Sequence, residues 1–156
     1  MENTAMPRAF ILALVLICGA ASAADSGPDA TPAPKDPALE RYNAASASKD
    51  WSGAAAAMKE ALSREPNNSD YHNRYAYSLR KGLDPDMNLV FKHYNEALRI
   101  DPKHRGAHEY IGEAYLMVGN VGKAKEHLGQ LDRLCFFPCQ EFRDLKNAIS
   151  EHEKKR

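Results

Sequence analysis

The sequence predicts an all-α fold of stacked antiparallel helix pairs, and the main reason is an internal repeat. Glu60-Ala61-Leu62, followed by Glu65-Pro66-Asn67, recurs as Glu96-Ala97-Leu98 with Asp101-Pro102-Lys103, and in diverged form as Gln130-Leu131-Asp132. The period is 36 residues from Pro66 to Pro102 and 34 residues from Ala97 to Leu131. Repeats of this length are typical of stacked helical hairpins, because one hairpin is too small to bury its own apolar face.

The expected elements are three helix pairs and a seventh helix, near 38–48 and 51–64, 69–81 and 85–99, 105–117 and 121–134, and 140–154. In the second pair, Asp84 is a suitable N-cap and Pro85 suits the first helical position, where a missing N–H costs nothing. The two extra residues of that unit are therefore expected in the turn from Lys81 to Asp84. Small residues should let neighbouring helices cross closely while bulky ones fill the space beside them: Ala54, Ala61, Ala76, Ala97 and Gly112, with Tyr94, Leu98, Tyr115 and Leu128.

The seventh helix is expected to cover the apolar end of the stack. A repeat array leaves such an end open, and an uncovered end aggregates. Apolar residues recur here at helical spacing on one face, whereas charged residues take the opposite face. The apolar set is Phe142, Leu145, Ala148 and Ile149, and the charged set is Glu141, Arg143, Asp144, Lys146, Glu151 and Glu153.

The N-terminus reads as an export signal. An apolar run from Phe10 to Ile17 follows Arg8 and precedes Ala21-Ser22-Ala23, the small-x-small pattern of a secretory cleavage site. This run is shorter than the roughly 20 residues that span a bilayer. We expect a signal peptide over 1–23, a proline-rich linker over 24–37, a repeat domain with its cap over 38–154, and a periplasmic or secreted product. Lipidation of Cys18 stays open as an alternative, although lipoprotein sites favour a smaller residue before the cysteine.

Charge balance narrows the class of partner. The chain has 21 basic and 21 acidic residues, so it produces no long-range field that would capture nucleic acid or an anionic membrane. We expect a protein or peptide partner, no nucleic acid and no membrane span, while the oligomeric state is not fixed by the sequence. No nucleophile, base and oxyanion site assemble in the pattern, so neither an enzyme nor a cofactor is expected.

One unit carries a family pattern in detail. His108-x-x-Ile111-Gly112-x-x-Tyr115 occupies the places of the W-x2-L-G-x2-Y pattern, and Gly119-Asn120 supplies the turn before the second helix. The chain thus resembles the tetratricopeptide repeat family. The second unit matches through Tyr75-Ala76-x-x-Leu79, and the first unit matches from Trp51 to Pro66 but poorly before it. The resemblance implies about three repeats in a right-handed α-solenoid that acts as a protein-interaction module.

The resemblance also assigns groove residues. In the family, the second, fifth, ninth and twelfth positions of each first helix face a concave groove. Glu109 and Glu113 then stand where a clamp for a C-terminal carboxylate would need cations, so a segment with basic residues suits the groove better. The alternative is that both are ordinary solvent-facing charges, although their i,i+4 spacing is mildly repulsive. The positions are Asp70, Asn73, Tyr77 and Arg80 in the second repeat, and Gly106, Glu109, Glu113 and Leu116 in the third.

A cysteine turn follows the third repeat, at Cys135-Phe136-Phe137-Pro138-Cys139. These two cysteines are the only ones left once the leader is removed, and an even pair in an oxidising compartment favours a disulfide. Such a bridge would fix the angle at which the capping helix docks. The turn is similar to that of small exported bacterial tetratricopeptide proteins that end in Cys-Phe-Phe-x-Cys, for which the resemblance implies no activity.

Thiol or metal chemistry is the alternative reading of the same turn. The C-x3-C spacing also occurs in exported copper chaperones, and thiolates select copper(I). His127 lies about two helical turns before Cys135, too far for a shared ligand shell. His104 and His108 are spaced i,i+4, as in some helical metal sites. His104 falls in a turn, however, and His108 replaces an inward tryptophan, so we expect a packed core histidine and no resident metal.

Overall fold

The computed structural model describes residues 36–155, and within them every element of secondary structure is an α-helix. The predicted leader and nearly all of the predicted linker lie outside this range. The all-α prediction is confirmed, and the predicted helix ends are correct to within about two residues. The helices are α1 (Pro37–Ala47), α2 (Trp51–Arg64), α3 (Ser69–Lys81), α4 (Met87–Ile100), α5 (Arg105–Met117), α6 (Val121–Leu134) and α7 (Gln140–Lys154).

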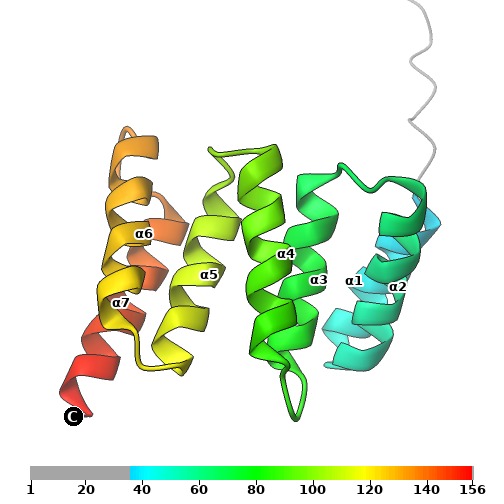
Figure 1. Ribbon diagram of the computed structural model, residues 1–156, viewed down its shortest axis with the longest axis horizontal. Helices are drawn as coiled ribbons and strands as arrows, with labels where there is room; N and C mark the ends of the chain where they lie inside the picture. The colour runs from blue at the N-terminus through cyan, green and yellow to red at the C-terminus, as the bar shows by residue number, and fades with distance from the viewer. Residues whose placement is uncertain (1–35, 156) are drawn as a thin grey trace, which may run out of the picture. The chain divides into compact units, whose positions relative to one another are not determined.

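Each helix packs against the next one in the chain, as expected for stacked antiparallel pairs. Figure 1 shows these helices side by side in chain order, from α1 and α2 at one end to α6 and α7 at the other. Contacts also join α3 to α5 and α5 to α7. The first helices of successive pairs therefore form a row of their own, and α7 takes the place of a first helix at the end of that row.

Polar N-caps explain why the helices begin where they do. Asp50, Asn68 and Asn120 each accept a hydrogen bond from the backbone N–H three residues on. This contact satisfies one of the donors that a helix start leaves without a partner. The prediction for α4 was wrong: its N-cap is Asp86, which accepts from the N–H groups of Asn88 and Leu89, and Pro85 precedes the helix. The inter-helix turn of this unit is accordingly longer than predicted.

Small residues set the spacing of the helices. The buried core of the described residues holds eight fully covered alanines: Ala38, Ala54, Ala61, Ala76, Ala97, Ala107, Ala114 and Ala124. Gly112 allows α5 and α7 to pack closely, because a Cβ there would lie 2.6 Å from Leu145 Cδ2. Leu145 and Ile149 of α7 are buried against Leu116, Ala124 and Leu131. The predicted capping role of α7 is therefore seen directly.

The turn between α6 and α7 carries the cysteine pair. Cys135 is the C-cap of α6 and Cys139 is the N-cap of α7. The two form a disulfide with their Cα atoms 5.8 Å apart. The bridge therefore spans the connection between the last repeat and its cap. Phe136 and Phe137 between the cysteines are both exposed.

Candidate binding groove

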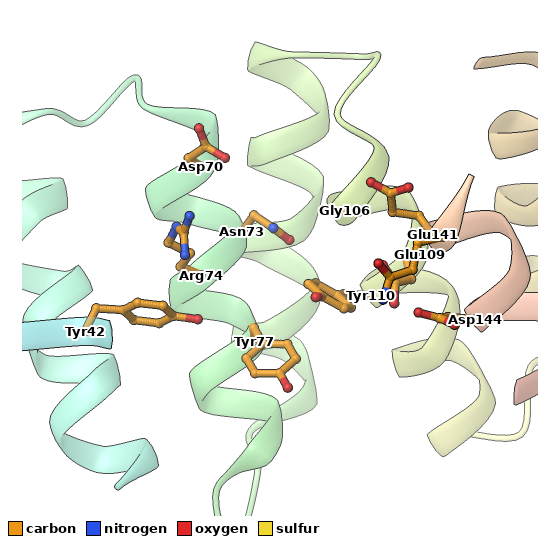
Figure 2. Close-up of a pocket in the computed structure, with 11 residues that line it drawn as sticks. Tyr42, Asp70, Asn73, Arg74, Tyr77, Gly106, Glu109, Tyr110, Glu141 and Asp144 are labelled. Carbon is orange, nitrogen blue, oxygen red and sulfur yellow. The ribbon is translucent and has the colours of Figure 1, made fainter. Parts of the chain in front are cut away.

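A pocket of about 290 Å³ opens along the row of first helices. Figure 2 shows its lining side chains, which come from helices that are far apart in the sequence. Most of the pocket lies between α3, α5 and α7, with one tyrosine from α1. Its lining is Tyr42, Asp70, Asn73, Arg74, Tyr77, Gly106, Glu109, Tyr110, Gln140, Glu141 and Asp144. Acidic and aromatic side chains dominate this list.

The structure divides the predicted groove residues between two neighbouring pockets. Asp70, Asn73, Tyr77, Gly106 and Glu109 line the pocket of Figure 2. The remaining three, one helical turn further along α3 and α5, line a second pocket of about 270 Å³. We call the two pockets together the groove. The second pocket is lined by Arg80, Glu113, Leu116, Met117, Ala148, Glu151, His152 and Lys155.

Arg80 and Glu113 are already bound to each other. The Arg80 Nη2 atom donates to Glu113 Oε2 at 2.6 Å, and the Arg80 side chain is only 7% exposed. The same guanidinium lies over the rings of Tyr77 and Tyr110, at 5.4 Å and 5.8 Å from their centroids. Glu113 therefore differs from the prediction, which left both glutamates of α5 available to a partner. Its charge neutralises a cation of the protein itself.

Glu109 is not a solvent-facing charge. It is 7% exposed, so the alternative that it is an ordinary surface residue was wrong. Burial raises its pKa from 4.5 to about 8, and the negative charges of Glu113, Asp144 and Glu141 act in the same direction, while Arg80 opposes them. A carboxyl in these surroundings is mostly protonated at neutral pH. Changes at Glu109 or Glu113 would thus alter the folded state as well as the groove.

Comparison with known proteins gives a result at the level of the fold. No family model and no curated protein matches the chain. Among solved structures, it is similar to the TPR2B domain of yeast Sti1 in its complex with pHsp70, with a TM-score of 0.61 and 18% sequence identity. The similarity covers 76% of this chain and 95% of that one. The fold is that of a tetratricopeptide repeat protein. Tetratricopeptide arrays typically serve as non-catalytic scaffolds for protein interaction.

Several pocket residues of this tetratricopeptide array were missed by the sequence reasoning. Glu141 and Asp144 were assigned to the solvated face of the cap, whereas both line the groove. The sequence contained a signal for them. The second, fifth, ninth and twelfth positions of α3 and α5 face the groove. The same positions of α7, counted from Gln140, are Glu141, Asp144, Ala148 and Glu151. All four line one of the two pockets. The other missed residues are Tyr42, Arg74, Tyr110 and Gln140 in the pocket of Figure 2, and Met117, His152 and Lys155 in the second pocket.

Aromatic rings form a continuous contact along the groove side of the array. Trp51 meets Tyr77 edge-on, with ring centroids 5.7 Å apart, and Tyr77 packs against Tyr110 at 4.8 Å. Arg74 lies over the ring of Tyr42 at 5.2 Å. These contacts fix the orientation of Tyr77 and Tyr110 between α3 and α5. The two rings form one wall of the pocket.

Two histidine pairs lie away from the groove, and each repeats the same geometry. His72 Nδ1 is 2.8 Å from His93 Nδ1, and His72 Nε2 is 2.9 Å from the carbonyl oxygen of Pro66. In the second pair, His108 Nδ1 is 2.9 Å from His127 Nδ1, and His108 Nε2 is 3.0 Å from the carbonyl oxygen of Pro102. A carbonyl only accepts, so each Nε2 carries its proton and donates, which leaves Nδ1 of His72 and His108 to accept.

These pairs confirm that His108 is a core histidine. Burial lowers the pKa of His108, and it lowers the pKa of His93 and of His127 to about 4, with the neighbouring histidine adding to the effect in both of the latter. His104 is the N-cap of α5, where its Nδ1 accepts from Ala107 N–H. Within residues 36–155, no group of three or more His, Cys, Asp or Glu side chains is placed to hold a metal ion.

In the part of the chain that the structure describes, none of the helices combines the length and the apolar character that crossing a membrane requires.

Proposed function

We propose that this protein is an exported interaction module that binds a peptide or protein partner in its groove. The proposal rests on one observation: residues of α3, α5 and α7 together line a surface that holds two pockets. Residues assigned to a ligand-facing role by the family register line that surface. A row of first helices that is rigidly packed and polar on its outer side suits the recognition of an extended or helical segment.

The charges of the groove favour a partner segment with basic residues. Asp70, Glu141 and Asp144 line the pocket of Figure 2 with one basic side chain, Arg74, and with Glu109, which is mostly protonated in the free protein. A negative surface of this kind attracts cationic groups and repels anionic ones such as a C-terminal carboxylate or a nucleic acid backbone. In the second pocket, Arg80 is neutralised by Glu113.

The similar solved structure supports the same class of function. The TPR2B domain of yeast Sti1 was solved as a complex with pHsp70. At 18% identity this likeness concerns the fold alone. We extend from it only the general role of holding a protein partner.

Export to the periplasm, or secretion, is part of the proposal. It rests on the apolar run from Phe10 to Ile17 and on Ala21-Ser22-Ala23, which precede the repeat domain. A disulfide at Cys135 and Cys139 fits an oxidising compartment. Cleavage after Ala23 would leave the proline-rich segment as a tether in front of α1.

Site-specific photo-crosslinking tests the groove as the binding surface. The crosslinking amino acid replaces Tyr110 in the groove, or Lys59 on the exposed side of α2 as the matched control. We expect discrete adducts from the Tyr110 position and their loss when Asp144→Lys is added to the same chain. Identical adducts from both positions, or groove adducts unaffected by Asp144→Lys, would contradict the proposal.

A further inference from the structure

The pocket of Figure 2 contains a buried acceptor with no hydrogen-bond partner. Asn73 of α3 is 7% exposed, and its Oδ1 atom has no partner among the described residues. An amide oxygen left in this state costs free energy comparable to a lost hydrogen bond. Asn73 lines the pocket, beside Gly106 of α5. A donor entering the pocket would remove this cost.

Two carboxyl groups in the same pocket also lack a partner. Glu109 of α5 and Asp144 of α7 form no hydrogen bond and no ion pair with another residue of 36–155. The other two acids differ, because Asp70 lies 3.2 Å from His104 Nε2 and Glu141 lies 3.6 Å from Arg105 Nε. Figure 2 shows Asn73, Glu109 and Asp144 among the side chains that line the pocket, on three different helices.

The surroundings of these three acceptors are apolar on one side and open on another. The rings of Tyr77 and Tyr110, 4.8 Å apart, form the aromatic wall. Gly106 keeps the space beside Asn73 open, since a Cβ there would already lie 3.4 Å from Asn73 Nδ2. A slender alkyl chain can pass along such a wall while its polar end reaches the acceptors.

We propose that this pocket binds a primary ammonium group on an alkyl stem, whose N–H donors are accepted by Asn73 Oδ1, Glu109 and Asp144. The inference rests on the proposed function, because the stem belongs either to a lysine of the partner segment or to a free diamine. An ammonium has three donors and no acceptor, which matches three acceptors on three helices. The tyrosine faces add attraction for a cation.

A guanidinium fits this set less well. Its planar fork is suited to two parallel hydrogen bonds with one carboxylate, whereas these acceptors belong to three separate side chains. In the next pocket, the protein's own guanidinium makes one hydrogen bond, from Arg80 to Glu113, and lies over Tyr77 and Tyr110. The two pockets therefore present different geometries to a cation.

Binding of the ammonium should release a proton. Glu109 is mostly protonated in the free protein, with a pKa near 8. A cation placed beside it favours the carboxylate, so the proton passes to solvent and the affinity rises as the pH increases from 6.5 to 8.5. The groups that act on Glu109 are Arg80 and Tyr77 on α3, Glu113 and Tyr110 on α5, and Glu141 and Asp144 on α7.

The test uses small probes and the mature chain. Nα-acetyl-lysine N-methylamide and cadaverine are titrated into ¹⁵N-labelled protein, with the Nε-acetylated lysine amide as the uncharged control. We expect the two amines to shift the Asn73 side-chain amide and the 106–110 backbone signals, and the control to leave them unchanged. Tighter binding of the lysine amide assigns the site to a partner's lysine, and tighter binding of cadaverine assigns it to a free diamine.

Variants connect the response to the three acceptors. Asp144→Asn and Asn73→Leu should each weaken binding of the tighter amine at least tenfold, whereas Glu126→Gln, on the exposed side of α6 and outside both pockets, should change it less than threefold. Calorimetry at pH 7 in buffers of different ionisation enthalpy should show proton release with the wild type and none with Glu109→Gln. The ¹⁵N spectrum of each variant shows whether it is folded.

Two results would overturn the inference. One is equal binding, or no binding, of the charged and acetylated lysine amides. The other is amine binding that Asp144→Asn and Asn73→Leu leave unchanged. If groove crosslinking to a partner persists in either case, the ammonium site fails while the proposed function stands. If crosslinking is also lost from Tyr110, both fail.

Discussion

Glu109 gives a quantitative prediction about stability, which the Glu109→Gln substitution tests. Glutamine has the shape of the protonated side chain but does not ionise. The pKa of Glu109 rises from 4.5 in an exposed setting to about 8 in the folded protein. A group whose pKa is raised by folding gives its full stabilisation below its ordinary pKa, and that stabilisation is lost as the pH rises through the folded value.

The magnitude follows from the size of this shift. Each pKa unit corresponds to about 1.4 kcal/mol, so raising the pH from 5 to 8 should cost the wild-type protein about 2 to 4 kcal/mol through this one side chain. The Glu109→Gln variant avoids that cost. Its free energy of unfolding should equal that of the wild type near pH 5 and exceed it by about 2 to 4 kcal/mol near pH 8.

Urea unfolding, followed by far-ultraviolet circular dichroism from pH 5 to 8.5, measures this difference. The difference between variant and wild type is the useful quantity, because both proteins share the histidine pairs. His93 and His127 have lowered pKa values, so they destabilise the fold as the pH falls below their ordinary range. Glu126→Gln on the exposed side of α6 is the matched control. Parallel pH profiles for wild type and Glu109→Gln would refute the reasoning.

Three further predictions concern other parts of the chain. Replacing Cys135 and Cys139 with serine should lower stability by about 2 kcal/mol in a thermal or urea melt, because the unfolded chain gains the freedom of an open loop. Labelling under denaturing, non-reducing conditions should find no free thiol in protein taken from its native compartment. Glu113→Ala should cost about 3 kcal/mol in a urea melt, because it leaves the buried Arg80 guanidinium without its counter-charge. Mass spectrometry of the exported protein should find Ala24 at the N-terminus.

Each of these outcomes has a contrasting result. Two reactive thiols, with copper(I) binding that is lost in the double serine variant, would replace the disulfide by the metal alternative. Glu96→Ala removes an ion pair with Arg99 that is partly exposed, so it should cost less than about 1 kcal/mol. An equal cost for Glu113→Ala would mean that Arg80 does not depend on its partner. An intact Met1 or Met6 in cytosolic protein would contradict export.

Most of the fold was predictable from the sequence because its determinants are local. Each helix is defined by apolar residues at helical spacing and by polar caps such as Asn68 and Asn120. These signals act over only a few residues of sequence. The start of α4 was missed because Asp84 and Asp86 are both good caps, and only the course of the turn selects between them. In the structure Asp86 is the N-cap, and its Oδ1 accepts from the N–H groups of Asn88 and Leu89.

The groove was predictable in position but not in chemistry. The family register placed Asn73, Glu109 and Glu113 on the surface that holds the two pockets, since it depends only on counting along a helix. Which of them is paired depends on residues that meet from different helices, such as Arg80 on α3 with Glu113 on α5. The raised pKa of Glu109 likewise comes first from its burial between helices, to which the charges of Glu113 and of Asp144, 35 residues away in sequence, add. Such encounters are not visible in a local pattern.

The histidine pairs have a mechanical consequence for the array. Each pair joins both helices of one repeat to the loop that precedes them, through the carbonyl of Pro66 or Pro102. If successive repeats rotated apart to widen the groove, the two hydrogen bonds of each histidine pair would be strained. These hydrogen bonds therefore oppose a change in the angle between successive repeats, and so in the width of the groove. A partner therefore meets a groove whose shape is already set. Binding then loses little free energy in ordering the groove around the partner.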